Sequence, residues 1–220
     1  MPIEKGVTPI CENCHEALHT TLEKLKKGLG LKIVFWGDSI TAGGFATNSR
    51  YFFVNQFLDG LYRLFPGNNI AYVNMGASGT NTAWRLPSFA GDVLSKHPDL
   101  VVVEFVNDFT LPPDTLEANY NAIIAQARAA GVELILCTPH LPTPRYLHLP
   151  TWHAVAESPY PTLIRKLCHS QGIALADVAR RWDQLEQEGL RPEMLLSDRL
   201  LHPNNYGHKI YAQELLSCFH

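Results

Sequence analysis

Leu31-Lys32-Ile33-Val34-Phe35-Trp36-Gly37-Asp38-Ser39-Ile40-Thr41 is the stretch that decides the fold. Its first half is mostly apolar, with β-branched and aromatic residues, which is typical of a strand buried on both faces. The pattern stops at Gly37-Asp38-Ser39, where small and polar residues favour a turn. Open parallel sheets bind ligands at the carboxyl ends of their strands, so a serine at this position can be an exposed nucleophile. On this stretch alone, a plain turn is the simpler interpretation.

Further apolar runs follow the first one along the chain. They cover residues 70–75, 99–105, 133–138 and 173–177. Helical patterns lie between or beside them, over residues 51–65, 82–96, 112–130 and 206–218. Strands that alternate with helices predict a parallel sheet with helices on both faces and right-handed crossovers. The sequence therefore predicts an α/β fold of three layers, α/β/α, around a central parallel sheet of about five strands.

The composition is that of an ordinary globular protein. Of 220 residues, 46% are hydrophobic and 18% are charged, which suits one α/β domain and excludes wholesale disorder. The formal charge of −3 gives no basic field for nucleic acid. No apolar run approaches the roughly 20 residues that span a bilayer. The first residues also lack the apolar core of a signal peptide, so we expect a cytoplasmic protein.

The N-terminal segment carries a short cysteine motif. Cys11-Glu12-Asn13-Cys14-His15 matches the C-x-x-C-H pattern of haem attachment. The same segment also fits an amphipathic helix over residues 12–29, with leucines at helical spacing. A metal site formed by Cys11, Cys14 and His15 lacks an evident fourth ligand. We interpret the segment as a helix start with incidental thiols and predict no metal and no cofactor. The odd number of cysteines, five, does not suggest a disulfide scaffold.

The segment from Pro139 to Pro161 interrupts the alternation of strands and helices. It contains six prolines, which are incompatible with a long helix at that point. His140, Tyr146 and Trp152 are interleaved with these prolines. Long loops after the carboxyl end of a strand are often functional, so the segment is either part of a substrate-binding surface or a packed surface loop.

Four residues from distant parts of the chain point to acyl transfer. Ser39, Gly79 and Asn107 each lie in a polar or glycine-rich turn after an expected strand, and His202 precedes the last expected helix. Such turns can converge, because the carboxyl ends of parallel strands share one edge. A serine nucleophile needs a base, and histidine suits neutral pH. The N–H groups of Ser39 and Gly79 and the Asn107 amide are donors that a developing oxyanion requires.

These residues resemble the GDSL or SGNH hydrolases. Residues 37–41 are similar to the nucleophile block of that family, residues 74–79 to its glycine block, Val106-Asn107-Asp108 to its G-x-N-D block, and His202-Pro203-Asn204 with Gly207 to its last block. The four blocks occur in the right order, and the resemblance covers about residues 32–215. It implies the flavodoxin-like SGNH-hydrolase fold over residues 31–220, after an N-terminal helical extension over residues 1–30.

The resemblance also implies roles for particular residues. It implies that Ser39 is the nucleophile, that His202 is the base, and that Gly79 and Asn107 are oxyanion donors. The chain departs from the pattern at Val106, where the family usually has glycine. It departs again at the acid, because the family pattern is D-x-x-H and the residue three before His202 is Arg199.

Asp198 stands four residues before His202. We expect its carboxylate to reach the imidazole through a slightly longer turn. The alternative is a Ser–His dyad in which a backbone carbonyl orients the imidazole.

The sequence thus predicts a serine esterase that acts through an acyl-enzyme on small-acyl esters, such as acetyl esters, of a carbohydrate or another polar substrate. Alternatives are a lipase or thioesterase, and a catalytically inactive binding module. The predicted substrate contacts are Asp38, Trp84, His140, Tyr146 and Trp152. For Asp38 we also expect backbone hydrogen bonds that support the turn beside Ser39.

Overall fold

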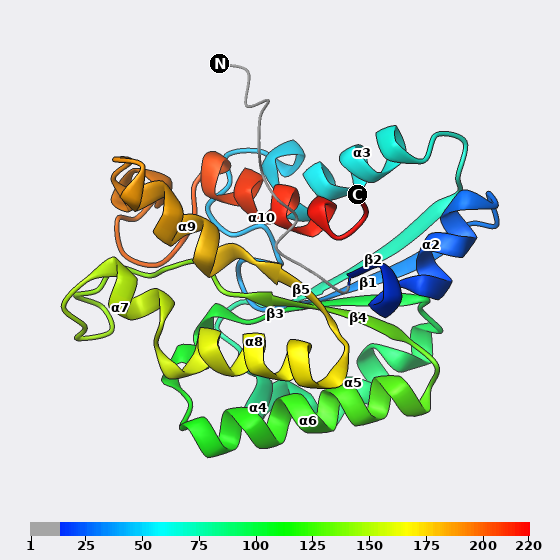
Figure 1. Ribbon diagram of the computed structural model, residues 1–220, viewed down its shortest axis with the longest axis horizontal. Coiled ribbons are helices and arrows are strands. Elements are labelled where there is room, and N and C mark those ends of the chain that lie inside the picture. The colour runs from blue at the N-terminus through cyan, green and yellow to red at the C-terminus, as the bar shows by residue number, and fades with distance from the viewer. Residues whose placement is uncertain (1–13) are drawn as a thin grey trace.

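The computed structural model describes residues 14–220, which form a parallel sheet between two layers of helices (Figure 1). The order of the strands is β2-β1-β3-β4-β5, and all four pairs are parallel. The strands are β1 (Leu31–Gly37), β2 (Ile70–Gly76), β3 (Leu100–Glu104), β4 (Glu133–Thr138) and β5 (Ala174–Asp177). This is the flavodoxin-like order, whose topological switch point lies between β1 and β3. The three-layer α/β/α fold with a five-stranded parallel sheet is confirmed.

Helices cover both faces of this sheet (Figure 1). The helices on one side are α1 (Cys14–Ala17), α2 (His19–Lys26), α3 (Phe53–Leu64), α7 (Trp152–Ala156), α9 (Val178–Gln187) and α10 (Asn205–Ser217). Those on the other side are α4 (Thr82–Arg85), α5 (Phe89–Asp92), α6 (Pro113–Ala129) and α8 (Pro159–Gln171). Within residues 14–220, no helix has the length and apolar character needed to cross a membrane.

Strand β1 contributes to both cores because its side chains alternate between the two faces of the sheet. Phe35 meets the rings of Phe53 and Phe57 edge to face on the side of α3. Trp36 points the other way and contacts Phe89 and Phe105. All of these rings are fully buried. The apolar run predicted from the sequence is therefore a strand buried on both faces.

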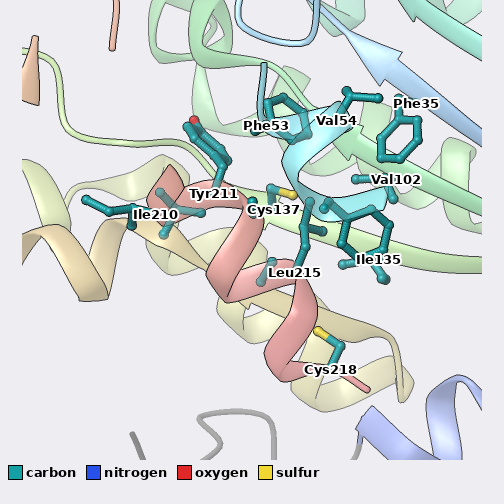
Figure 2. Close-up of a cluster of buried hydrophobic side chains, with 14 of the residues drawn as sticks. Phe35, Phe53, Val54, Val102, Ile135, Cys137, Ile210, Tyr211, Leu215 and Cys218 are labelled. Atoms are coloured by element: carbon teal, nitrogen blue, oxygen red, sulfur yellow. The ribbon is translucent and has the colours of Figure 1, made fainter. Parts of the chain in front are cut away.

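Helix α10 closes one core over the middle of the sheet (Figure 2). Its buried residues Tyr211 and Leu215 belong to the same cluster as Val102 of β3 and Ile135 of β4. The Tyr211 ring stacks on Phe53 of α3, with centroids 5.2 Å apart. Because α10 directly follows the loop that carries His202, this packing anchors one end of that loop.

Two regions differ from the sequence prediction. The single helix expected over residues 82–96 is broken into α4, α5 and short 3-10 turns, since Pro87 lies in its middle and a proline there removes a helical hydrogen bond. The loop expected up to Pro161 is also too long, because α7 and the start of α8 lie inside it. Prolines at 159 and 161 are tolerated in the first turn of α8, where backbone N–H groups have no partner within the helix.

The N-terminal helices pack on the same domain. Leu18, Leu22 and Leu25 are at most 3% exposed and belong to the cluster formed with α3 and α10. Cys14 is buried and disulfide-bonded, so the interpretation of its thiol as incidental is corrected, whereas Cys11 lies outside the described residues. We propose that α1 and α2 belong to an N-terminal extension, residues 1–30, of the α/β domain that starts at residue 31, and that these two helices stabilise the domain.

This packing predicts a large effect of truncating Leu22. Leu22→Ala should lower the free energy of unfolding by about 2–5 kcal/mol, because it leaves a cavity under α2. Leu29 is 68% exposed, so Leu29→Ala is the matched control and should change the value by less than about 0.5 kcal/mol. Urea denaturation measures both variants. Equal stability of the two variants would contradict the packing of α2 into the core.

Candidate active site

The candidate site lies at the carboxyl edge of the sheet, on the turns that follow β1, β2 and β3. Ser39 comes two residues after the end of β1, Gly79 three residues after β2, and Asn107 three residues after β3. The turns after β1 and β2 approach closely, since Ala77 donates its N–H to the Gly37 carbonyl at 3.0 Å. A Cβ at Gly37 would collide with the Glu104 carbonyl oxygen and with Thr41 Oγ1. A residue without a side chain is therefore required where β1 ends.

Ser39, His202 and Asp198 form one chain of hydrogen bonds. Ser39 Oγ lies 3.2 Å from His202 Nε2, and His202 Nδ1 lies 2.7 Å from Asp198 Oδ2. The Ser39 side chain is nearly buried, and the His202 side chain remains 19% exposed. Because the carboxylate can only accept, Nδ1 carries a hydrogen and Nε2 is free to accept the serine proton. The arrangement is that of a nucleophile, a base and a group that orients the base.

The longer spacing between Asp198 and His202 is accommodated by a turn that the Asp198 carboxylate itself closes. Its Oδ1 accepts the N–H groups of Leu200, Leu201 and His202 at 2.9–3.0 Å. Arg199 has a φ of 56°, so the additional residue adopts the left-handed conformation. The turn brings the acid to the imidazole despite the departure from D-x-x-H.

The charge of Asp198 is well supported in this turn. Partial burial acts to raise its pKa, but the bonds from the His202 ring and from three backbone N–H groups outweigh that effect. They lower the pKa of Asp198 to about 2. The carboxylate is therefore ionised throughout the neutral range, as an acceptor for the imidazole N–H must be.

Three N–H donors at this edge are available to a ligand. The backbone N–H groups of Ser39 and Gly79 donate to no partner within residues 14–220. Gly79 has a φ of 75°, and nothing lies within 4 Å of where its side chain would be. Asn107 Nδ2 donates one hydrogen to the Thr80 carbonyl at 3.0 Å, which leaves its second hydrogen. Val106, at the position that is usually glycine, is buried and leaves this amide in place.

Two buried acids connect the turns to one another. Asp38 accepts the N–H of Ile40 at 3.1 Å and the N–H of Asn107 at 2.9 Å. Asp108 accepts the N–H of Thr82 at 2.8 Å, which ties the turn after β3 to the start of α4. Burial raises the pKa of Asp38 to about 7 and that of Asp108 to about 6, although these backbone bonds oppose the shift. The buried Asp38 carboxylate thus fixes the backbone positions of Ser39 and Asn107 through hydrogen bonds on the interior side of the two turns.

Phe45 is a residue of the site that the sequence did not indicate. Its ring stacks on the His202 imidazole, with centroids 4.2 Å apart and planes 23° from parallel, and 56% of the residue is exposed. Its φ of 65° is left-handed, and its carbonyl accepts a hydrogen bond from Ser197 Oγ. No motif marks this phenylalanine, because its contact with His202 joins segments more than 150 residues apart.

The predicted substrate contacts divide into accessible and buried residues. Trp84 is 71% exposed and Tyr146 is 38% exposed, so both remain available for a ligand. Asp38, His140 and Trp152 are 0%, 0% and 7% exposed, and their prediction as substrate contacts is corrected. Asp38 supports the turn as expected, and Trp152 packs in the core at the start of α7. His140 contacts Tyr211 and the Leu201 carbonyl instead of the surface.

Metal-ligating side chains do not gather in the part of the chain that the structure describes. Across residues 14–220, no group of three or more His, Cys, Asp or Glu side chains is arranged to hold an ion. The cysteine motif at residues 11–15 lies partly outside this range.

Several solved structures share the fold. A two-domain esterase active on acetylated mannans has a TM-score of 0.76 and 19% identity, over 94% of this chain and 53% of that chain. This chain therefore spans about half the length of that esterase. A catalytic mutant of an acetylxylan esterase from Geobacillus stearothermophilus has a TM-score of 0.68 and 21% identity, over 86% and 94% of the two chains. An α/β hydrolase enzyme from the metagenome of Lake Arreo, Spain, has a TM-score of 0.70 and 25% identity, over 86% and 95%.

A sequence search among curated proteins finds no match. The model of the GDSL-like lipase/acylhydrolase family matches residues 35–210, which include the turns of Ser39, Gly79 and Asn107 and the loop of His202. The resemblance noted in the sequence is confirmed, and the chain belongs to the GDSL-like lipase/acylhydrolase family.

Proposed function

We propose that the protein is a serine esterase that hydrolyses carboxylic esters through an acyl-enzyme. The observation that carries the proposal is the hydrogen-bond chain from Ser39 Oγ through the His202 imidazole to the Asp198 carboxylate. A serine hydroxyl is a weak nucleophile unless a base removes its proton as it attacks. The 3.2 Å separation of Oγ and Nε2 is suitable for that transfer.

The reaction proceeds in two halves. Ser39 Oγ attacks the ester carbonyl while its proton passes to His202 Nε2, and Asp198 stabilises the imidazolium that forms. The N–H groups of Ser39 and Gly79 and the Asn107 amide bind the oxyanion of the tetrahedral intermediate. His202 then protonates the departing alcohol, which leaves an acyl-Ser39 ester. In the second half, His202 deprotonates a water that attacks this ester, and the serine is restored as the acid leaves.

The proposed substrates are small-acyl esters, such as acetyl esters, of a carbohydrate or another polar molecule. Trp84 and Phe45 expose large parts of their rings, and Trp84 follows the Gly79 turn closely in the chain. Aromatic rings offer flat apolar surfaces, and the indole N–H of a tryptophan adds a hydrogen-bond donor. This combination suits sugars, which have both apolar faces and hydroxyl groups. Structural neighbours that act on acetylated mannans and acetylated xylan agree with this substrate class.

Replacing the nucleophile is the first test of this function. Wild-type protein should hydrolyse short nitrophenyl esters, and Ser39→Ala should lose that activity while it keeps its fold. Ser95→Ala, which alters an exposed serine outside the site, is the matched control and should keep the wild-type rate. A serine-directed phosphonate should label wild type at Ser39 only. Full activity in Ser39→Ala would refute the mechanism, and faster hydrolysis of long-chain than of acetyl esters would refute the small-acyl substrate.

The Asn107 amide should contribute to the transition state. Asn107→Ala removes one proposed oxyanion donor, so kcat should fall by about 10²–10³-fold. KM should change little, because the donor acts mainly on the charge that develops during the reaction. Steady-state kinetics on the acetyl ester measures both constants. An unchanged kcat would remove Asn107 from the oxyanion hole.

The left-handed conformation of Arg199 should be needed for activity. The left-handed region, with positive φ, is strongly disfavoured for a β-branched residue, whereas glycine adopts it readily. We therefore expect Arg199→Val to lower kcat by at least about tenfold through loss of the Asp198 turn, at a cost of roughly 1–2 kcal/mol in local conformation. Arg199→Gly should keep kcat within about twofold of wild type. Equal rates for the two variants would show that the turn geometry does not matter.

A further inference from the structure

The loop over residues 198–202, which we call the catalytic loop, is bound by the segment that follows β4. Two residues of that segment contact two successive carbonyl groups of the loop. The Thr143 N–H donates to the Leu200 carbonyl at 2.9 Å. The imidazole Nε2 of His140 contacts the carbonyl of the next residue, Leu201. Leu201 directly precedes His202, so these bonds act on the backbone next to the proposed base. His140 is fully buried and takes no part in the reaction steps proposed above.

Hydrogen-bond chemistry fixes the tautomer of His140. The Leu201 carbonyl can only accept, so Nε2 of His140 must carry a hydrogen. Burial lowers the pKa of His140 to about 3, which keeps the ring neutral, so its Nδ1 must accept. The group that faces Nδ1 is the Tyr211 hydroxyl at 2.9 Å, which therefore donates to it.

A buried carboxyl group completes this chain of bonds. Glu104 Oε1 lies 3.3 Å from the Tyr211 oxygen, whose single hydrogen already points to His140. Glu104 must therefore carry a proton to bond there, while its Oε2 accepts from Thr41 Oγ1 at 3.0 Å. Burial raises the pKa of Glu104 well above its usual range, and nearby Asp38 adds to that effect. Each donor in the series thus meets one acceptor.

We propose that the buried series Glu104–Tyr211–His140 positions His202, with His140 as the residue that holds the Leu201 carbonyl in place. The series runs from the end of β3, through α10, to the end of β4, so it ties the catalytic loop to the rigid core. This inference rests on the proposed esterase function. It makes His140 a positioning residue, which acts on the reaction only through the loop that carries the base.

Two substitutions at His140 separate the hydrogen bond from simple packing. His140→Leu removes the donor to Leu201, and His140→Gln keeps an amide donor near the position of Nε2. Displacement of a catalytic group by about 1 Å can cost 10²-fold in rate, so we expect kcat of His140→Leu to fall by about 10- to 10²-fold with KM within about twofold. His140→Gln should recover most of that loss. A His140→Gln rate as low as that of folded His140→Leu overturns the proposal.

Tyr211→Phe tests the series without a change at the core histidine. It removes the hydroxyl that accepts the backbone N–H of His140 and bonds His140 Nδ1 and Glu104 Oε1, so kcat should fall by about 3- to 10-fold. Tyr62→Phe is the matched control, because its hydroxyl donates to the Ile70 carbonyl at the opposite edge of the sheet. That variant should keep the wild-type kcat. This pair decides the question if His140→Leu does not fold, and equal kcat values for the two tyrosine variants overturn the proposal.

A spectroscopic measurement keeps the inference separate from the esterase proposal. The Nδ1 proton of His202, held by Asp198, should give a strongly downfield proton NMR signal that disappears in His202→Ala. This signal should shift or broaden in His140→Leu and remain in His140→Gln. Failure of the esterase proposal would appear as wild-type protein with no turnover and no phosphonate label, whereas failure of the positioning proposal would appear as an unchanged signal and unchanged kcat in folded His140→Leu.

Discussion

The Asp198 carboxylate is the group on which the geometry of the candidate site depends. One of its oxygens accepts three successive backbone N–H groups and so closes the turn over residues 198–202. The other accepts the His202 Nδ1–H and orients the ring toward Ser39. A single carboxylate therefore shapes the loop and aligns the imidazole that the loop carries. Arg199, which lies inside this turn, has a left-handed φ of 56°.

The rest of the site is a set of turns held together from the interior. Asp38 and Asp108 bind backbone N–H groups of neighbouring turns, and His140 binds the backbone beside His202. Burying a polar or ionisable side chain costs free energy unless the side chain is hydrogen-bonded. When its hydrogen bonds are made, the buried group rigidifies the backbone segments that it binds. Ser39 and Asn107 therefore lie on turns that are fixed to the core near the switch point of the sheet, where a doubly wound fold binds its ligands.

The sequence was sufficient for the fold because its signals are local. Apolar runs followed by small polar residues mark each strand and the edge where it ends, and the strand at residues 31–37 was evident in this way. The same local signals predicted that Ser39, Gly79 and Asn107 lie at one edge of the sheet, because each follows the end of a strand. We expected a longer turn from Asp198 to His202, and the observed hydrogen bonds agree with it. The sequence did not indicate that Arg199 adopts the left-handed conformation.

The errors arose where long-range packing decides the outcome. His140 and Trp152 belong to a proline-rich segment typical of surface loops, yet both side chains point into the core. Burial of a histidine depends on distant partners, here Tyr211 and the Leu201 carbonyl, which no local pattern reveals. The stacking of Phe45 on His202 is hidden for the same reason.

The measurement that tests the account most directly is the rate of Asp198→Asn. Asparagine keeps an oxygen for the three backbone N–H groups, so the turn should survive, but its amide cannot accept the His202 Nδ1–H. If Asp198 orients the base, kcat should fall by about 10⁴-fold while the fold and thermal stability stay close to wild type. A rate within about tenfold of wild type would contradict the account and leave a Ser39–His202 dyad as the working mechanism.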